Sequence, residues 1–139
     1  MKRVVTVLFL LFSLSLVAQA ADKAAQEKAA QGATDQFLAL TDAGHYAQSW
    51  DAASTFFKSA ITKEKWNSAL TSVRQPLGPV QSRKLLSATY THELPGAPDG
   101  DYVVVKYETS FENKKSSVET LATTLEKDGQ WKVSGYFIK

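Results

Sequence analysis

Hydrophobic positions along the chain follow a helical period up to about residue 75 and a strand period after it. Ala33, Phe37 and Leu40 lie three or four residues apart, and Gly44 follows at a position where glycine commonly ends a helix. A second helical face is formed by four residues at similar spacing, Tyr46, Trp50, Ala53 and Phe57. Two helices are therefore predicted before residue 58, and the second is expected to run unbroken through these four positions.

A third helix is predicted after Thr62, because a threonine hydroxyl suits the position that caps a helix N-terminus. Glu64 then lies in the first turn, where the helix dipole favours a negative charge. Pro76 disfavours helical geometry at Gln75, so the helix is expected to end there. The three tryptophans are expected to anchor the core: Trp50, Trp66 and Trp131.

From about residue 82 onward apolar residues alternate with polar ones, which is the period of a β-strand. Four strands are predicted, at about residues 82–94, 101–112, 117–126 and 130–138. The short links between them favour an antiparallel meander. The expected fold class is α+β, with three N-terminal helices packed on one face of a curved four-stranded sheet.

The hairpin between the last two strands sets the expected register. A three-residue loop at 127–129, with its glycine in the left-handed region, places Leu125 opposite Trp131. Because residues paired across a ladder share a face, this register extends to four rows that point toward the helices. The expected rows are Leu86–Thr109–Glu119–Phe137, Ala88–Tyr107–Leu121–Gly135, Tyr90–Val105–Thr123–Val133 and His92–Val103–Leu125–Trp131.

The N-terminal residues have the pattern of a secretory signal peptide. Lys2 and Arg3 give a positive start, residues 4–17 are mostly apolar, and Ala18-Gln19-Ala20 fits a small-x-small cleavage pattern. We expect cleavage after Ala20, a periplasmic or secreted location, and no membrane insertion of the mature chain. The predicted division is a signal peptide at residues 1–20, a helical or flexible lead at 21–33 and the α+β domain at 34–139.

Charge and composition narrow the function classes. The chain has 16 basic and 14 acidic residues, but Lys2 and Arg3 belong to the predicted signal peptide, so the mature domain is formally neutral. Nucleic acid is therefore not expected as a partner. With no cysteine and only two histidines, we expect no disulfide, no metal centre and no cofactor. Arg74, Arg83 and Lys84 are expected at a solvated rim, with anion binding as the alternative.

Four stretches carry a family resemblance: "DAGHYAQSWDAA", "VRQPLGPVQSRKL", "LPGAPDGDYVVVKYETSF" and "DGQWKVSGYFIK". With them, the chain from about Phe37 onward resembles the bacterial domain-of-unknown-function family 4019 (DUF4019). The last stretch also resembles the closing hairpin of the wider NTF2-like, cystatin-like superfamily. That resemblance implies a sheet wrapped on helices as a cone, often with a pocket between them. Because the superfamily includes enzymes and plain binding domains, the fold does not select a function.

Six side chains are expected to point into the space between the helices and the sheet: Tyr90, His92, Tyr107, Thr109, Glu119 and Thr123. A carboxylate or imidazole in an apolar enclosure has a shifted pKa, which is how acid–base sites arise. Glu119 and His92 are therefore the candidate acid or base, and Gly135 is expected to leave space beside Tyr107. The expected register separates Glu119 from His92 by three rows, so structural roles are the simpler interpretation.

The opposite face of the sheet is expected to carry an apolar patch of Val104, Tyr136 and Ile138. Such a patch favours a homodimer or a partner protein. The first hypothesis is a non-enzymatic binding or interaction module for an unknown small ligand or an envelope protein. The alternative is a small-pocket acid–base enzyme, isomerase-like or dehydratase-like, that uses Glu119 or His92 on a small molecule.

Overall fold

A computed structural model gives the structure of residues 2–139, with side chains described from Leu16 onward. In this range four helices precede four strands: α1 Lys2–Asp42, α2 Tyr46–Ala52, α3 Thr55–Ala60, α4 Lys63–Leu77, β1 Val80–Thr91, β2 Tyr102–Phe111, β3 Lys114–Leu125 and β4 Trp131–Ile138. The strands form one antiparallel sheet in the order β1-β2-β3-β4. The predicted α+β class and meander are confirmed, but four helices replace the three expected.

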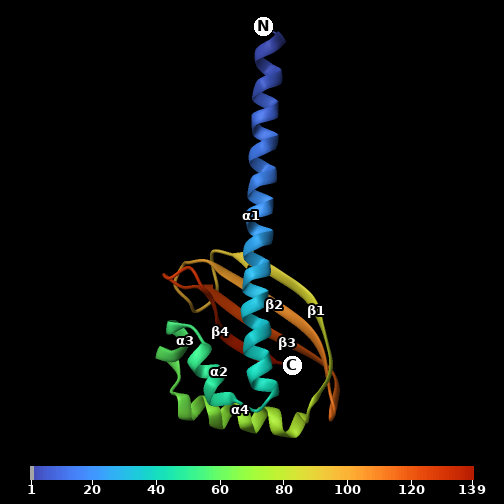
Figure 1. The fold of residues 1–139 in the computed structure, drawn as a ribbon, viewed down its shortest axis with the longest axis vertical. Helices are drawn as coiled ribbons and strands as arrows, with labels where there is room; N and C mark the ends of the chain where they lie inside the picture. The colour runs from blue at the N-terminus through green and yellow to red at the C-terminus, as the bar shows by residue number, and fades with distance from the viewer. Residues whose placement is uncertain (1) are drawn as a thin grey trace.

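One face of the sheet is covered by the C-terminal half of α1, while the N-terminal half of this helix extends away from the domain (Figure 1). α2 packs against α4, and α3 contacts β4. The core between the two layers contains apolar side chains at most 2% exposed, Phe37, Leu38, Val103, Val105 and Leu121. Of the three tryptophans, Trp66 is buried, and Trp50 and Trp131 are partly buried against the core.

The segment 21–33, for which a helix and a flexible lead were both open, belongs to α1. Ala30 is buried, and Oε1 of Glu27 accepts a hydrogen bond from the backbone N–H of Tyr90 at 3.0 Å. The side chains of residues 1–15, which make up most of the predicted signal peptide, lie outside the described residues. Among the helices whose side chains are described, none is long and apolar enough to cross a membrane.

The predicted second helix is interrupted at Ser54 and forms two short helices, α2 and α3. Ser54 has extended backbone angles, and its hydroxyl accepts the N–H of Phe57 at 3.1 Å, which caps α3. Its own N–H donates to the carbonyl of Val133 at 2.8 Å, and the Ser134 hydroxyl donates to its Oγ at 2.8 Å. The unbroken helix was a wrong prediction because these contacts with β4 hold the Ser54 backbone outside helical geometry.

α4 begins as predicted, with the Thr62 hydroxyl accepting a backbone N–H of the first turn at 3.3 Å. Its buried face contains Trp66, Leu70 and Arg74. The helix continues two residues beyond Gln75, and Gly78, with φ of 71°, ends it. The prediction that Pro76 ends the helix at Gln75 was wrong, because a proline in the last turn removes a single backbone bond and the next glycine supplies the left-handed position.

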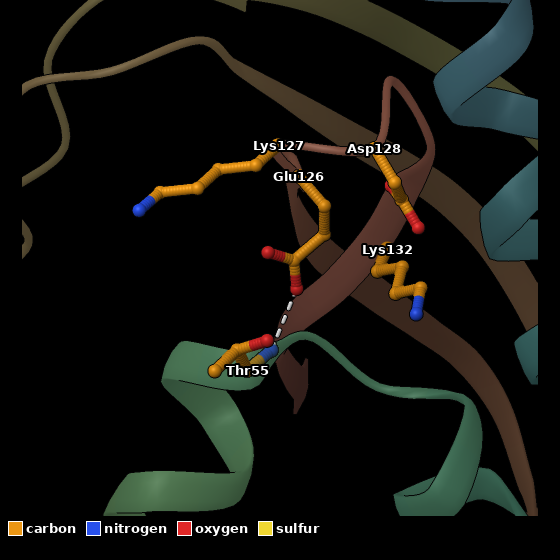
Figure 2. A pocket seen from close by; sticks show the side chains of 5 residues that line it. All are labelled: Thr55, Glu126, Lys127, Asp128 and Lys132. Atoms are coloured by element: carbon orange, nitrogen blue, oxygen red, sulfur yellow. Dashed lines mark hydrogen bonds between the residues drawn. The ribbon is translucent and has the colours of Figure 1, made fainter.

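The hairpin between β3 and β4 has the predicted register, with Leu125 opposite Trp131. Gly129 has φ of 83°, which is the left-handed conformation that the three-residue loop requires. The hairpin also contacts the helices, because Oε1 of Glu126 accepts the N–H of Thr55 at the start of α3 at 2.6 Å (Figure 2). This bond joins the loop end of the sheet to the helical layer.

The register between β2 and β3 differs from the prediction by two residues. Glu119 lies opposite Tyr107, and not opposite Thr109. The cause is a tight turn at residues 112–113, which starts β3 three residues earlier than predicted. Because side chains alternate with a period of two, Glu119 keeps its inward direction.

β1 also pairs two residues away from the expected register. Val103 lies opposite Tyr90, and not opposite His92, which falls beyond the end of the strand. A bulge at Leu86 shifts the pairing by one more residue toward the start of β1. As a result Arg83 comes to lie opposite Thr109, on the face that the helices cover.

A bulge at Ser134 reverses the faces of the residues that follow it in β4. Tyr136 is 9% exposed and packs in the core, and Ile138 packs partly buried against it, whereas Phe137 is 64% exposed. The prediction of an outer patch containing Tyr136 and Ile138 was therefore wrong. The prediction that Gly135 and Phe137 face the helices was wrong for the same reason.

We expect Ser54→Ala to lower the free energy of unfolding by about 1–2 kcal/mol, because it removes a helix cap and leaves the Ser134 hydroxyl without its acceptor. Urea denaturation followed by circular dichroism measures the change. The control is Thr55→Ala, at an exposed neighbouring position that uses only its backbone N–H. Equal denaturation midpoints for Ser54→Ala and the unmodified protein would contradict the role of the cap.

Candidate functional site

The structure places the six predicted pocket residues in two different environments. The inward side chains of β2 and β3 are buried, namely Tyr107, Thr109, Glu119 and Thr123. Tyr90 is partly buried, and the His92 side chain is 73% exposed. Glu119 and His92 are not brought together, because each has its own partners at a different part of the sheet.

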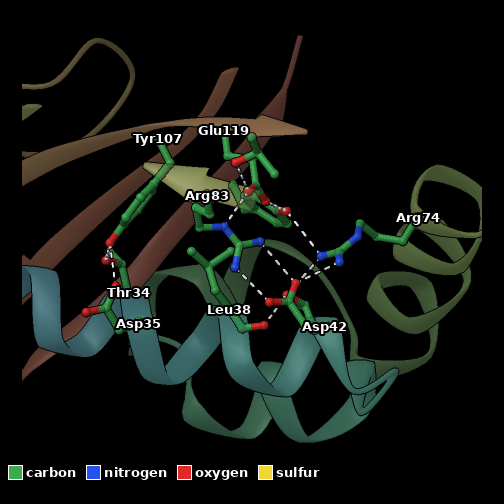
Figure 3. Close-up of polar contacts among 11 residues, drawn as sticks. Thr34, Asp35, Leu38, Asp42, Arg74, Arg83, Tyr107 and Glu119 are labelled. Atoms are coloured by element: carbon green, nitrogen blue, oxygen red, sulfur yellow. Dashed lines mark hydrogen bonds and ion pairs between the residues drawn. The ribbon is translucent and has the colours of Figure 1, made fainter. Parts of the chain in front are cut away.

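Glu119 is fully buried, and three donors surround its carboxylate (Figure 3). Oε1 accepts Nε of Arg83 at 2.7 Å and the hydroxyl of Thr109 at 2.5 Å. The Tyr136 hydroxyl donates to Oε2. The four residues come from four different strands, so this carboxylate joins the whole width of the sheet.

Asp42, at the end of α1, connects Arg83 and its partner Glu119 to the helices. Arg83 donates to both of its oxygens, from NH1 at 2.7 Å and from NH2 at 3.0 Å. Arg74 of α4 donates from NH2 to Oδ1 at 2.7 Å. Two guanidinium groups and two carboxylates therefore form a charge cluster, defined here as Asp42, Arg74, Arg83 and Glu119, whose formal charge is zero (Figure 3). Glu119 and Arg74 are buried, whereas the Asp42 side chain is 30% exposed.

Arg74 is 5% exposed, and most of its polar atoms are used within the cluster. NH1 donates to the Thr41 hydroxyl at 3.1 Å and to the Tyr136 hydroxyl at 3.3 Å. Its guanidinium carbon lies 5.2 Å from the ring centre of Phe111, a distance typical of a cation–π contact. Nε is buried without a hydrogen-bond partner among the described residues.

The pairing of charges governs the pKa values in the cluster. Burial alone would raise the pKa of Asp42, but hydrogen bonds from Arg83 and Arg74 outweigh it and lower that pKa below its usual value. Burial would likewise lower the pKa of Arg83, yet its bonds to Asp42 and Glu119 raise it. Burial and the neighbouring Glu119 charge raise the pKa of Tyr136, so this phenol stays a neutral donor.

The cluster is poorly suited to acid–base chemistry. A general base must have a lone pair directed at a substrate proton, and Glu119 is fully buried with three donors from the protein itself. Its charge is balanced by arginines that also bind Asp42, so no net charge is left for an ionic ligand. The prediction that Arg74 and Arg83 lie at a solvated rim was wrong, because Arg74 is buried beside Asp42 and the Arg83 side chain reaches inward to the buried carboxylate of Glu119.

Sequence reasoning did not single out Asp42, although a signal was present. Thr34, Leu38 and Asp42 recur every four residues and therefore share one face of α1. Leu38 is in the core and Thr34 is buried, so this face of α1 is directed toward the sheet. Asp42 belongs to the same face. An inward Glu119 also requires a nearby cation, which pointed to an arginine on the same face.

The space beside Tyr107 is occupied by α1. The Tyr107 hydroxyl donates to Oδ1 of Asp35 at 2.7 Å and lies 2.7 Å from the Thr34 hydroxyl. Burial, with the bond to Asp35, raises the pKa of Tyr107. Gly135 does not open a cavity here as predicted, because the bulge in β4 places it on the other face, against the ring of Phe137.

A second polar group lies at the loop between β1 and β2. Oδ1 of Asp101 accepts the Tyr90 hydroxyl and lies 3.3 Å from Nδ1 of His92. The rings of Tyr90 and His92 meet edge to face with their centres 5.0 Å apart. The hydrogen bond to Asp101 raises the pKa of Tyr90 to about 12. Among the described residues no group of three His, Asp or Glu side chains is arranged to hold a metal ion.

Glu119→Gln is expected to lower the free energy of unfolding by about 3–5 kcal/mol, because Arg83 would keep its charge while losing a buried carboxylate. The matched control is Glu108→Gln, an exposed position of β2, for which we expect a change within about 0.5 kcal/mol. Urea denaturation of both variants makes the comparison. A small and equal effect of the two substitutions would show that the cluster does not hold the sheet.

The lowered pKa of Asp42 predicts a pH-dependent stability. Its contribution is complete above the unfolded pKa of about 4 and is lost as pH falls through the folded value. The stability difference between the unmodified protein and Asp42→Asn should therefore be large at about pH 6 and shrink steadily below about pH 4. Denaturation series at several pH values measure it, and a difference that does not change with pH would contradict the prediction.

Comparison with known proteins identifies a family. The family model described as "Protein of unknown function (DUF4019)" matches residues 33–136, which is well over half of the chain. No curated protein matches the chain. The matched range begins in α1 and ends at Tyr136, so it includes the whole charge cluster. The chain therefore belongs to the DUF4019 family.

Proposed function

We propose that this protein is an exported, NTF2-like, non-enzymatic binding or interaction module. The observation that carries the proposal is the closed interior, in which Glu119 has no exposed surface and its charge is balanced by arginines. Export is supported by the signal-peptide pattern of residues 1–20, and the NTF2-like relationship by the α+β meander and its closing hairpin. With the interior filled, recognition takes place at the surface.

The outer face of the sheet has an apolar surface suited to a partner. Register places Val104, Ala122 and Gly135 in one row across β2, β3 and β4, and Phe137 follows in the next row. Val118 of β3 lies on the same face. We call these five residues the outer apolar patch. Phe137 is 64% exposed and Val118 is 37% exposed, so apolar area on this face is open to a partner.

We assign a second copy of the chain as the occupant of this patch. Lys106 and Glu108 lie two residues apart on the outer face of β2, both exposed. A twofold axis between them would place Lys106 of one copy opposite Glu108 of the other, which makes the surface complementary to itself. Residues 21–139 contain equal numbers of basic and acidic residues, so net charge does not oppose self-association.

The second candidate is a small-molecule acid–base enzyme that uses His92. The observation that favours it is the contact of Nδ1 with Asp101, because a carboxylate beside one ring nitrogen fixes the orientation of an imidazole. Support is weaker than for the binding module, because the imidazole stands in an open surface setting and water competes there for every polar contact.

Sedimentation velocity tests the homodimer. The purified protein is expected to form a dimer at about 100 µM that Phe137→Asp converts to a monomer, because a buried carboxylate at the centre of an apolar interface lacks a partner. Val73→Asp, at a 48% exposed position of α4, should remain dimeric. A monomer for the unmodified protein, or a dimer for Phe137→Asp, would overturn the assignment of a second copy.

A further inference from the structure

A hollow of about 150 Å³ lies on the outer face of the sheet, where α3 and the loop between β1 and β2 meet β4. Two of the side chains that line it are large, apolar and open to solvent, since Phe56 of α3 is 45% exposed and Phe137 of β4 is 64% exposed. Residues 94–97 of the loop line it as well, and so does Tyr102 of β2. Apolar surface from several segments therefore surrounds one concave space.

The floor of the hollow is made by two small residues, Ala122 of β3 and Gly135 of β4, which lie opposite each other in the ladder. A Cβ at Gly135 would lie 3.4 Å from the Phe137 ring and 3.8 Å from the Cβ of Ala122, so a larger side chain would take up part of this space. The bulge at Ser134 directs Gly135 and Phe137 to the outer face. The same irregularity that brings Tyr136 into the core thus leaves room on the outer face.

Hydrogen bonds hold the walls of the hollow in place. Ser54, at the start of α3, is bound to β4 through both its N–H and its hydroxyl. In the loop, the N–H of Ala97 donates to the carbonyl of Leu94 at 3.2 Å, and the Tyr102 hydroxyl donates to the carbonyl of Pro98. The hollow is therefore already formed in the free protein, which lowers the entropic cost of binding a ligand.

The lining offers little to a charged group. Among the described residues that line the hollow, none has a charged side chain. Two side-chain hydroxyls line it, those of Tyr102 and Ser134, and both donate to other residues of the chain. The affinity for a ligand must then come from apolar contact, much of it with aromatic rings.

The geometry points to a binding site, in this hollow, for a small molecule built on one aromatic ring. A space of about 150 Å³ with apolar walls holds a single benzene-sized ring. The rings of Phe56 and Phe137 are exposed beside that space, and aromatic rings that meet edge to face or offset attract one another beyond their apolar contact. The volume therefore sets the size of the ligand, and the lining sets its chemistry.

The hollow shares Ala122, Gly135 and Phe137 with the outer apolar patch, so a second copy on that patch would use some of the same side chains. All residues that line the hollow belong to one chain, and the inference therefore does not rest on the proposed homodimer. Val118 belongs to the patch but does not line the hollow. Val118→Asp is thus expected to prevent self-association and to leave the hollow unchanged.

The experiment is a ¹⁵N–¹H NMR titration of the unmodified protein and of Val118→Asp with two probes, benzyl alcohol and cyclohexylmethanol. The probes share a hydroxymethyl group and differ in whether the ring is aromatic. We expect benzyl alcohol to shift the backbone amides of Gly96, Ala122 and Gly135 in a saturable way, with a Kd on the order of 1 mM. Cyclohexylmethanol should bind at least about threefold more weakly, because it cannot make contacts between aromatic rings.

Two pairs of variants make the test specific. Ala122→Leu fills the floor and should weaken the binding of benzyl alcohol at least about tenfold, whereas Ser110→Leu, at an outward position of β2 that does not line the hollow, should leave the Kd unchanged. Phe56→Ala should weaken binding about fivefold, whereas Val73→Ala, at a similarly exposed position of α4, should not. The spectrum of each free variant checks its fold.

The titration of Val118→Asp decides this inference, while sedimentation of the unmodified protein decides the homodimer separately. The proposal is overturned if the shifts in Val118→Asp do not saturate below about 20 mM or centre on other residues. It is also overturned if cyclohexylmethanol binds as tightly as benzyl alcohol, or if Ala122→Leu keeps the affinity of the unmodified protein.

Discussion

A carboxylate without access to solvent must have its charge neutralised by the protein, and Glu119 imposes this condition on the whole domain. Arg83 reaches it from β1, and the Tyr136 hydroxyl reaches it from β4. Asp42 then binds Arg83 and Arg74, so the same group of charges extends to α1 and α4. The outer strands of the sheet and two helices are thus held in one relative position, because moving any of them would take an ion-pair or hydrogen-bond partner away from a buried side chain.

A closed interior changes where function is to be sought. In a domain with helices on one sheet face, the space between the layers is the usual place for a ligand, but here the apolar core and the charge cluster fill it. What remains is the surface of the domain. Its outer sheet face, with Phe137 exposed, suits a flat apolar partner.

Sequence patterns correctly predicted features that depend on only a few neighbouring residues. The Thr62 cap and the register of Leu125 with Trp131 follow from turn and capping preferences of a few neighbouring residues, and both are confirmed. Bulges were not predictable, because an extra residue is stabilised by contacts between distant segments, as at Ser134. One such residue reverses every following side chain, which explains why Tyr136 was assigned to the wrong face. The charge cluster depends on the bulges and on helix docking together, so it was missed for the same reason.

Glu126 joins the β3–β4 hairpin to α3, and at the opposite edge of the sheet Glu27 of α1 accepts the N–H of Tyr90. That N–H belongs to an edge strand, whose unpaired backbone groups are a template for strands of other chains. By occupying this position, α1 shields part of β1 from intermolecular pairing. Protection against aggregation thus depends on the docked first helix, and the edge of β1 stays open to other chains until that helix has packed.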